Sequence, residues 1–149
     1  MSATREEVLK TLVGCFELFS KDLDKDVAKS LRARARDMYP DLVTKGFSYV
    51  LVLCASRGDL SVVESGLQGS GCQELLRLVK KKGLKSEDAS YALYGALLLM
   101  SMSKMGFLHG TKFSDVIRNA LDDPVLDSAA YGLMDWIKRL AEAYIEVER

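Results

Sequence analysis

The stretch "ASYALYGALLLMSMS", Ala89 to Ser103, decides the fold because it is long, apolar and free of charge. It is shorter than the roughly 20 residues that a membrane span needs, so it predicts a buried helix of a globular bundle. Ser86, Glu87 and Asp88 place a cap and two negative charges where a helix would begin. The helix is expected to reach about Met105. Because it is apolar nearly all round, we expect it to be the central helix.

The residues before this stretch repeat with helical periodicity. Thr4 and Glu7 match a capping box at the start of the first helix. Pro40 is predicted to end a second helix, since the residue before proline avoids helical dihedral angles. A third helix is then expected from about Asp41 to Arg57, with Gly58 as its stop. The side chains expected to face inward in these three helices are Val8, Leu9, Leu12, Val13, Phe16, Phe19, Ala28, Leu31, Ala35, Met38, Val43, Phe47, Val50, Leu51 and Cys54.

The C-terminal part predicts two more helices. One covers Thr111 to Leu121, and the other starts at Asp123 and Pro124, a cap followed by proline at the first helical position. In the last helix the apolar spacing of 4, 3, 4, 3, 4 and 3 favours a packing seam inside one bundle over an intermolecular coiled coil. The seam residues are Leu126, Ala130, Leu133, Ile137, Leu140, Tyr144 and Val147. We therefore predict an all-α fold in which residues 1–149 form a single-domain bundle of about six to seven helices, with a buried central helix and a long C-terminal helix.

Charge and cysteine content restrict the class of protein. The 21 basic residues balance 21 acidic ones, which argues against a free-standing nucleic-acid binder but leaves room for a local basic patch. Cys15, Cys54 and Cys72 are widely spaced and form no CxxC pair. They predict no disulfide framework, a reducing cytosol, and thiols that act as small apolar side chains.

One glycine-rich stretch resembles a phosphate-binding loop at first sight. In "ESGLQGSGCQELL", Glu64 to Leu76, Gly66 and Gly71 have the spacing of a Walker A loop. Cys72 and Gln73 occupy the positions of its lysine and hydroxyl residue, so neither the phosphate cation nor the magnesium ligand is present. A mobile connection between helices is favoured, and a nucleotide-dependent enzyme is the weaker alternative.

The single histidine of the sequence does not indicate a catalytic or metal site. His109 is the only histidine, and it lacks the partners of a triad or a zinc site. We therefore predict no catalytic residue, no metal site, no cofactor and no enzymatic activity.

Basic residues carry the predicted nucleic-acid contacts. Lys25, Lys29, Arg32 and Arg36 have helical spacing and share one face, whereas Arg34 lies off that stripe. Such a face can neutralise phosphates without reading sequence. It can equally be a solvated helix surface, an alternative that stays open. The further candidates are Lys45, Arg57, Lys80, Lys81 and Lys82.

Three stretches together resemble one family. They are "RARDMYPDLVTKGFSYVLVLCASRG" (Arg34 to Gly58), "ASYALYGALLLMSMSKMG" (Ala89 to Gly106) and "DSAAYGLMDWIKRLAEAYIEVE" (Asp127 to Glu148). In order and spacing they resemble the small α-helical subunit of the Cmr complex, the type III-B CRISPR RNA-silencing effector. The resemblance covers most of the chain and is weakest from Asp59 to Lys85. Phe47 stands where the family usually has leucine, a change that a core position tolerates.

The resemblance implies a cytoplasmic, non-enzymatic subunit. Its partners would be other Cmr subunits, further copies of itself stacked head to tail as an inner filament, and the backbone of the CRISPR RNA–target RNA duplex. It implies no membrane and no small-molecule substrate. The alternative is a helical protein-interaction module without a nucleic-acid role.

Overall fold

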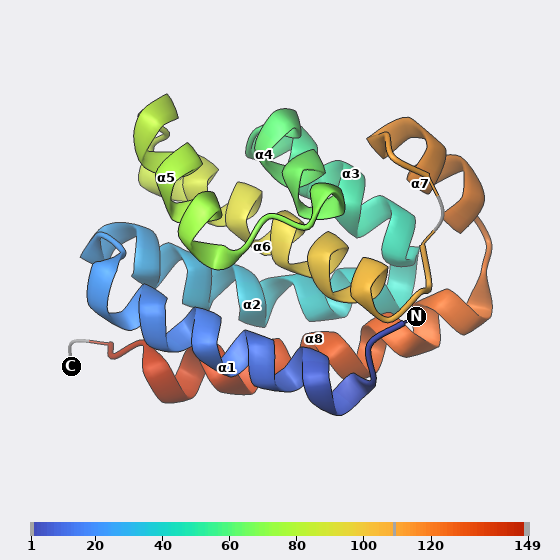
Figure 1. Cartoon of the computed structure of the whole chain (residues 1–149), viewed down its shortest axis with the longest axis horizontal. Helices are drawn as coiled ribbons and strands as arrows, with labels where there is room; N and C mark the ends of the chain where they lie inside the picture. Colours follow the sequence, from blue (N-terminus) through green and yellow to red (C-terminus); the bar gives the residue numbers. More distant parts are fainter. Residues whose placement is uncertain (1, 109, 148–149) are drawn as a thin grey trace.

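The fold is an assembly of α-helices around one central helix (Figure 1). The computed structural model describes residues 2–108 and 110–147, and these residues contain eight α-helices, one short 3₁₀ helix and no β-strand. The predicted all-α fold is confirmed, with one helix more than the upper prediction. The elements are α1 (Arg5–Asp22), α2 (Lys25–Lys45), α3 (Phe47–Arg57), α4 (Leu60–Ser65), the 3₁₀ helix η1 (Gly66–Gln68), α5 (Cys72–Lys82), α6 (Ser86–Lys104), α7 (Phe113–Ala120) and α8 (Pro124–Tyr144).

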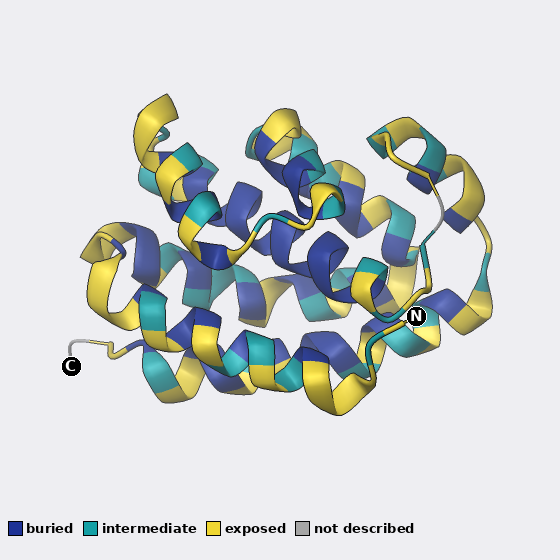
Figure 2. Ribbon diagram, in the orientation of Figure 1, coloured by how far each residue is buried: buried dark blue, intermediate teal, exposed yellow. Residues whose placement is uncertain are grey.

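Helix α6 is the centre of the bundle, as predicted. Every residue from Ala89 to Met102 is buried, which Figure 2 shows as an unbroken dark band through the molecule. The helix contacts α2, α3, α4, η1, α5 and α8. An uncharged helix that is apolar on all sides can be covered on all sides without burying an ion, and this explains its position.

Glycines allow two neighbours to approach α6 closely. A Cβ atom added at Gly58 would lie 2.5 Å from the backbone nitrogen of Ala92, and one added at Gly66 would lie 2.5 Å from the carbonyl oxygen of Ala96. On α6 itself, a Cβ atom at Gly95 would lie 2.8 Å from the Cβ atom of Cys54. The end of α3 and the α4–η1 segment therefore rest directly on the backbone of α6.

Helices α1, α2 and α8 form the other side of the bundle, with α8 in contact with both α1 and α2 (Figure 1). The α8 seam is buried from Leu126 to Leu140, Tyr144 is half-buried, and Val147 lies exposed beyond the helix. The predicted caps are also present: Asp123 accepts hydrogen bonds from Val125 N and Leu126 N, and the capping box at the start of α1 is complete.

The prediction that Pro40 ends a helix is wrong. Helix α2 continues through Pro40 to Lys45 and ends at Gly46, whose φ of 90° is the left-handed region that glycine favours. Pro40 lies on the exposed face, where water can bond the carbonyl group that loses its partner, while Met38 and Leu42 stay buried on the other face.

Two further predictions, one of an inward-facing residue and one of a helix boundary, are also wrong. Val43 belongs to the last turn of α2 and is 63% exposed, so it does not face the core. The helix predicted over Thr111 to Leu121 is shorter, because α7 spans Phe113–Ala120 and Leu121 is exposed beyond it. His109 lies outside the described residues.

The glycine-rich stretch is more ordered than a simple connection. Its first part is helical in α4 and η1, and Gly66 is buried against α6. Gly69 adopts a left-handed conformation with φ of 73°, and Gly71 precedes α5 without a side-chain cap. The need for close packing at Gly66 explains the first glycine of the Walker-like spacing.

The prediction that all three cysteines are free thiols is wrong. Cys15 of α1 and Cys72 of α5 form a disulfide with a Cα–Cα distance of 5.5 Å. The two cysteines are 57 positions apart in the sequence, which gave no sign of this bond, since the fold alone brings the two helices together. Cys54 does behave as predicted: it is free and buried, and burial raises the pKa of its thiol to about 12.

Candidate nucleic-acid and assembly surfaces

The nine predicted basic residues do not form one surface. Lys25 and Lys29 border the end of α8. Arg34, which is not one of the nine and lies off the predicted α2 stripe, instead contacts Tyr91 of α6. Lys45 lies at the far end of α2, and Lys80 to Lys82 occupy the last turn of α5. The nine residues therefore fall into separate groups with different partners.

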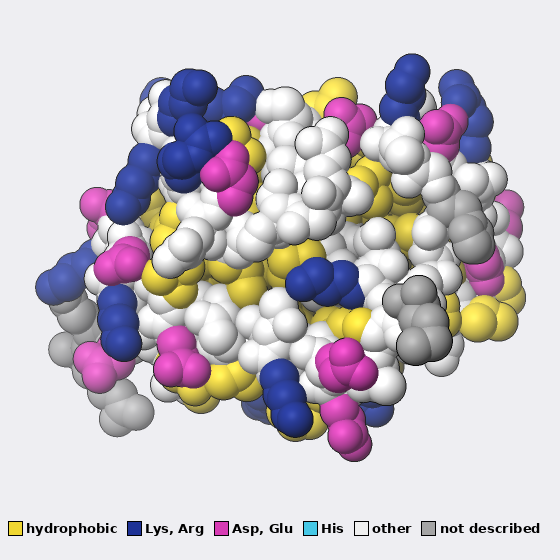
Figure 3. All heavy atoms as spheres, viewed as in Figure 1, with side chains coloured by type: hydrophobic (Ala, Val, Ile, Leu, Met, Phe, Trp, Pro, Cys, Tyr) yellow, Lys and Arg dark blue, Asp and Glu magenta, His cyan; other side chains and the backbone are white. Residues whose placement is uncertain are grey.

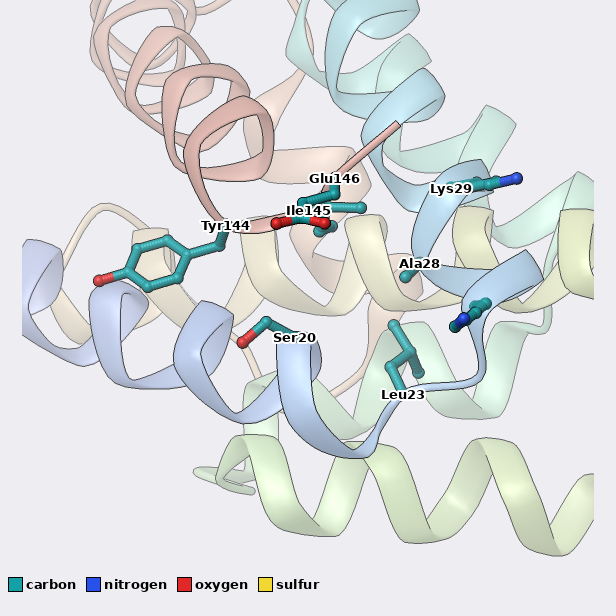
Figure 4. Close-up of a pocket in the computed structure, with 8 residues that line it drawn as sticks. Ser20, Leu23, Ala28, Lys29, Tyr144, Ile145 and Glu146 are labelled. Atoms are coloured by element: carbon teal, nitrogen blue, oxygen red, sulfur yellow. The ribbon is translucent and has the colours of Figure 1, made fainter. Parts of the chain in front are cut away.

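The predicted stripe on α2 is only partly available. Lys25 and Lys29 line a hollow between the α1–α2 turn and the end of α8, where Glu146 supplies a carboxylate (Figure 4). Arg36 pairs with Asp37 at 3.1 Å, which offsets its charge. Arg32 is half-buried, and its Nε atom is buried without a hydrogen-bond partner. This stripe is mixed in sign and partly engaged by the fold.

Two arginines from different helices meet at Tyr91. The Arg34 Nη1 group donates to the Tyr91 hydroxyl at 2.6 Å, and its guanidinium carbon lies 4.7 Å from the ring centroid. The guanidinium carbon of the exposed Arg57 lies 5.9 Å from the same centroid. The negative face of an aromatic ring attracts both cations and lets them stand near each other.

One carboxylate lies close to this pair in the structure. Asp37 Oδ2 is 3.7 Å from Arg34 Nη2, and the contact is exposed on the Asp37 side and partly buried on the Arg34 side. Arg57 pairs with no acid in the described part of the chain, so its five donors are open to a ligand from solution.

An ion pair links this arginine pair to α5. The Lys82 amine lies 3.3 Å from Asp59 Oδ2, and Asp59 caps α4 two residues after Arg57. Burial opposes ionisation of Asp59, but hydrogen bonds from Ser61, Val62 N and Lys82 outweigh it and hold the pKa of this carboxyl below its usual value.

Two more lysines extend the positive charge along α5. Lys80 and Lys81 are exposed in the same turn as Lys82, and Figure 3 shows a group of basic side chains over α5. We call Arg34, Arg57, Lys80, Lys81 and Lys82 the α3–α5 basic surface.

Sequence reasoning found four of these five residues and missed Arg34. The hydrogen bond between Arg34 and Tyr91 joins residues 57 positions apart, so local spacing could not reveal it. The tyrosines in the uncharged part of α6 were the available sign, because a buried phenol usually has a polar partner, but they did not show which tyrosine would meet an arginine. Lys45 stands apart from the surface, with its amine 4.5 Å from the ring centroid of Tyr49.

Exposed apolar side chains gather at the end of the bundle where α3, α7 and the start of α8 meet. One hollow brings Tyr49 and Val52 of α3 beside Leu121, and a neighbouring hollow brings Val43 beside Tyr131. Asp127 borders both, so the two hollows are neighbours. We define the apolar end face by its exposed large side chains, which are Val43, Tyr49, Val52, Leu121, Val125 and Tyr131.

A patch of this kind is typical of a contact with another macromolecule. Within residues 2–108 and 110–147, no three His, Cys, Asp or Glu side chains are grouped to hold a metal ion. No helix in the same residues has the length and apolar character to cross a membrane. The described residues form a helical bundle that carries the α3–α5 basic surface and the apolar end face.

Comparison with known proteins identifies a relative that matches nearly end to end. The chain is 28% identical over 154 residues to the CRISPR system CMR subunit Cmr5 of Saccharolobus solfataricus, a match that covers 95% of this chain and 96% of the relative. This confirms the resemblance to a Cmr subunit of the type III-B CRISPR system that the helix patterns predicted. No protein-family model matches the chain, and no solved structure matches it.

Proposed function

We propose that this chain is a single-domain, non-catalytic, cytoplasmic small subunit of a Cmr-type RNA-guided effector complex. In this complex it contacts the phosphate backbone of the guide–target duplex and neighbouring subunits, including further copies of itself in an inner filament. The observation that carries the proposal is the similarity to a Cmr subunit along 95% of the chain.

The α3–α5 basic surface supports the nucleic-acid part of the proposal. Arg57 is exposed and pairs with no acid in the described residues. It shares the Tyr91 ring with Arg34, and Lys82 pairs with Asp59, which follows Arg57 by two residues. The chain has no net charge, so binding would be local and weak for one copy. Repetition of the same surface along a filament would multiply it.

The apolar end face supports the assembly part. A filament of identical subunits uses two different surfaces on each copy, so a patch at one end of the molecule can extend the row without closing it. The α2 stripe is a weaker candidate for RNA, because Arg36 pairs with Asp37 and Arg32 is half-buried.

Reconstitution of the complex with its guide RNA tests both parts. We expect the double substitution Arg57→Gln and Lys81→Gln to weaken retention of target RNA and to lower the slope of log affinity against log salt by about one per lost phosphate contact. Arg118→Gln is the matched control, because Arg118 is an exposed arginine of α7 that pairs with Asp115. An unchanged salt slope in the double variant would remove the α3–α5 basic surface from the proposal.

A second arm separates assembly from RNA binding. Val52→Glu with Leu121→Glu should prevent incorporation into the complex while leaving the melting temperature of the isolated chain nearly unchanged, because both side chains are exposed. Leu60→Glu is the control, since Leu60 is equally exposed but lies on α4. If incorporation depends on the end face while no basic variant affects RNA, the chain is a helical interaction module without a nucleic-acid role.

A further inference from the structure

Helix α5 is bounded by glycines with open space around them, although the Gly83 N–H still caps the helix by donating to Lys80 O. Gly69 and Gly83 have positive φ angles of 73° and 61°. No atom lies within 4 Å of a Cβ added at Gly69, Gly71 or Gly83, in contrast to Gly66, which is wedged against α6. The chain is thus fixed up to η1 and has rotational freedom on either side of α5.

Two attachments hold the ends of α5, in addition to the buried side chains of Leu75, Leu76 and Val79. At its start the disulfide from Cys72 to Cys15 of α1 is a covalent cross-link to the bundle, and Gly71 offers no side-chain cap. At its end the amine of Lys82 pairs with Asp59. The disulfide is therefore the strongest anchor of the first turn.

We propose that Cys15 and Cys72 form a reversible thiol–disulfide site that controls whether α5 stays docked on the bundle. In the reducing direction a dithiol supplies two electrons and two protons. One of its thiolates attacks a sulfur of the pair, which gives a mixed disulfide and releases one cysteine. The second thiol of the reductant then displaces the other cysteine and leaves as a cyclic disulfide. A small-molecule disulfide acts as oxidant in the reverse direction.

The contacts between the helices confine the effect of reduction to α5. Helix α1 remains attached through its contacts with α8, and α6 is covered on its other sides by α2, α3 and α4. Loss of the disulfide therefore frees α5 and uncovers only the part of α6 that lies beneath it. Because Lys80 and Lys81 belong to α5, release of this helix also displaces two cations of the α3–α5 basic surface. This inference does not depend on the proposed function.

Hydrogen exchange of the isolated chain, measured by mass spectrometry, tests the proposal. The oxidised protein is compared with the same protein treated with a dithiol. We expect the amides of residues 75–82 to exchange about 1,000-fold faster after reduction, the scale set by the loop-closure entropy for a sequence separation of 57, with the largest change in the first turns. Exchange in α6 should stay within a few-fold. The double variant Cys15→Ala and Cys72→Ala should behave as reduced in both conditions, and Cys54→Ala should keep the full response.

Three results would overturn the proposal. One is equal protection of α5 in the two redox states. Another is an acceleration spread evenly over α6 and α8, which would make the disulfide a general stabiliser. The third is an intact mass that does not fall by two hydrogens when the reduced protein is treated with a disulfide oxidant.

Discussion

Replacement of Gly66 by alanine tests the close contact on which the bundle is built. Gly66 has helical dihedral angles (φ −58°, ψ −30°), so alanine fits the backbone and would stabilise it by about 0.4–1 kcal/mol in open space. Here the new Cβ would lie 2.5 Å from the carbonyl oxygen of Ala96 and 3.2 Å from the Cβ atom of Leu99.

The size of the destabilisation by Gly66→Ala depends on which atoms must move to relieve the close contact. Carbon and carbonyl oxygen atoms approach to about 3.3 Å at closest, so the two backbones must separate by roughly 0.8 Å. The oxygen belongs to the backbone of a buried helix and cannot rotate away. Overpacking of this kind costs about 1–3 kcal/mol, and we place Gly66→Ala at the upper end. The backbone stabilisation by alanine offsets part of this overpacking cost. The free energy of unfolding should therefore fall by about 2 kcal/mol, which lowers the melting temperature by about 4–8 °C.

Gly14→Ala is the matched control. Gly14 lies within α1, and a Cβ atom there meets nothing within 4 Å, so this substitution should raise the free energy of unfolding by about 0.5–1 kcal/mol. Both variants are compared by guanidinium unfolding followed by circular dichroism, without reductant so that the disulfide stays closed. If Gly66→Ala stabilises the protein as Gly14→Ala does, then η1 does not rest on α6 and the packing argument fails.

Substitutions at three further positions test single interactions. Asp127→Ala removes the Oδ1 atom that accepts from Phe47 N at 2.9 Å, and it should cost about 1 kcal/mol in urea unfolding, whereas Asp127→Asn should cost less. Tyr94→Phe removes a buried hydroxyl without a hydrogen-bond partner, so it should raise the melting temperature; a fall would show that the hydroxyl has a partner. The lowered pKa of Asp59 stabilises the folded state above the unfolded pKa, and this stability is lost as pH falls through the folded pKa. Asp59→Asn should therefore flatten the decline in stability between about pH 5 and pH 3, as measured by urea midpoints.

Local patterns were sufficient where a helix has one buried face. The α8 seam from Leu126 to Leu140 and the uncharged run in α6 were predictable because burial repeats with the helix itself. The caps at Thr4 and Asp123 were equally accessible, since their hydrogen bonds join residues three or fewer positions apart.

The errors share a different cause, which is that tertiary packing overrides local preference. Pro40 did not end α2, because its face is exposed and the burial of Leu42 carries the helix onward. The Cys15–Cys72 bond and the Arg34–Tyr91 contact each join residues 57 positions apart. No spacing rule covers such pairs, since they depend on which helices become neighbours.

The same packing connects the core to the α3–α5 basic surface. Because Gly58 has no Cβ, the end of α3 lies against the backbone of Ala92, the residue after Tyr91. That contact sets Arg57 over the Tyr91 ring and leaves Asp59 in reach of Lys82. The position of the cations is thus fixed by a glycine and an alanine that carry no charge. A substitution that lifts α3 away from α6 would separate Arg57 from Arg34 while leaving the charge of the surface unchanged, so sequence charge alone could never have defined this surface.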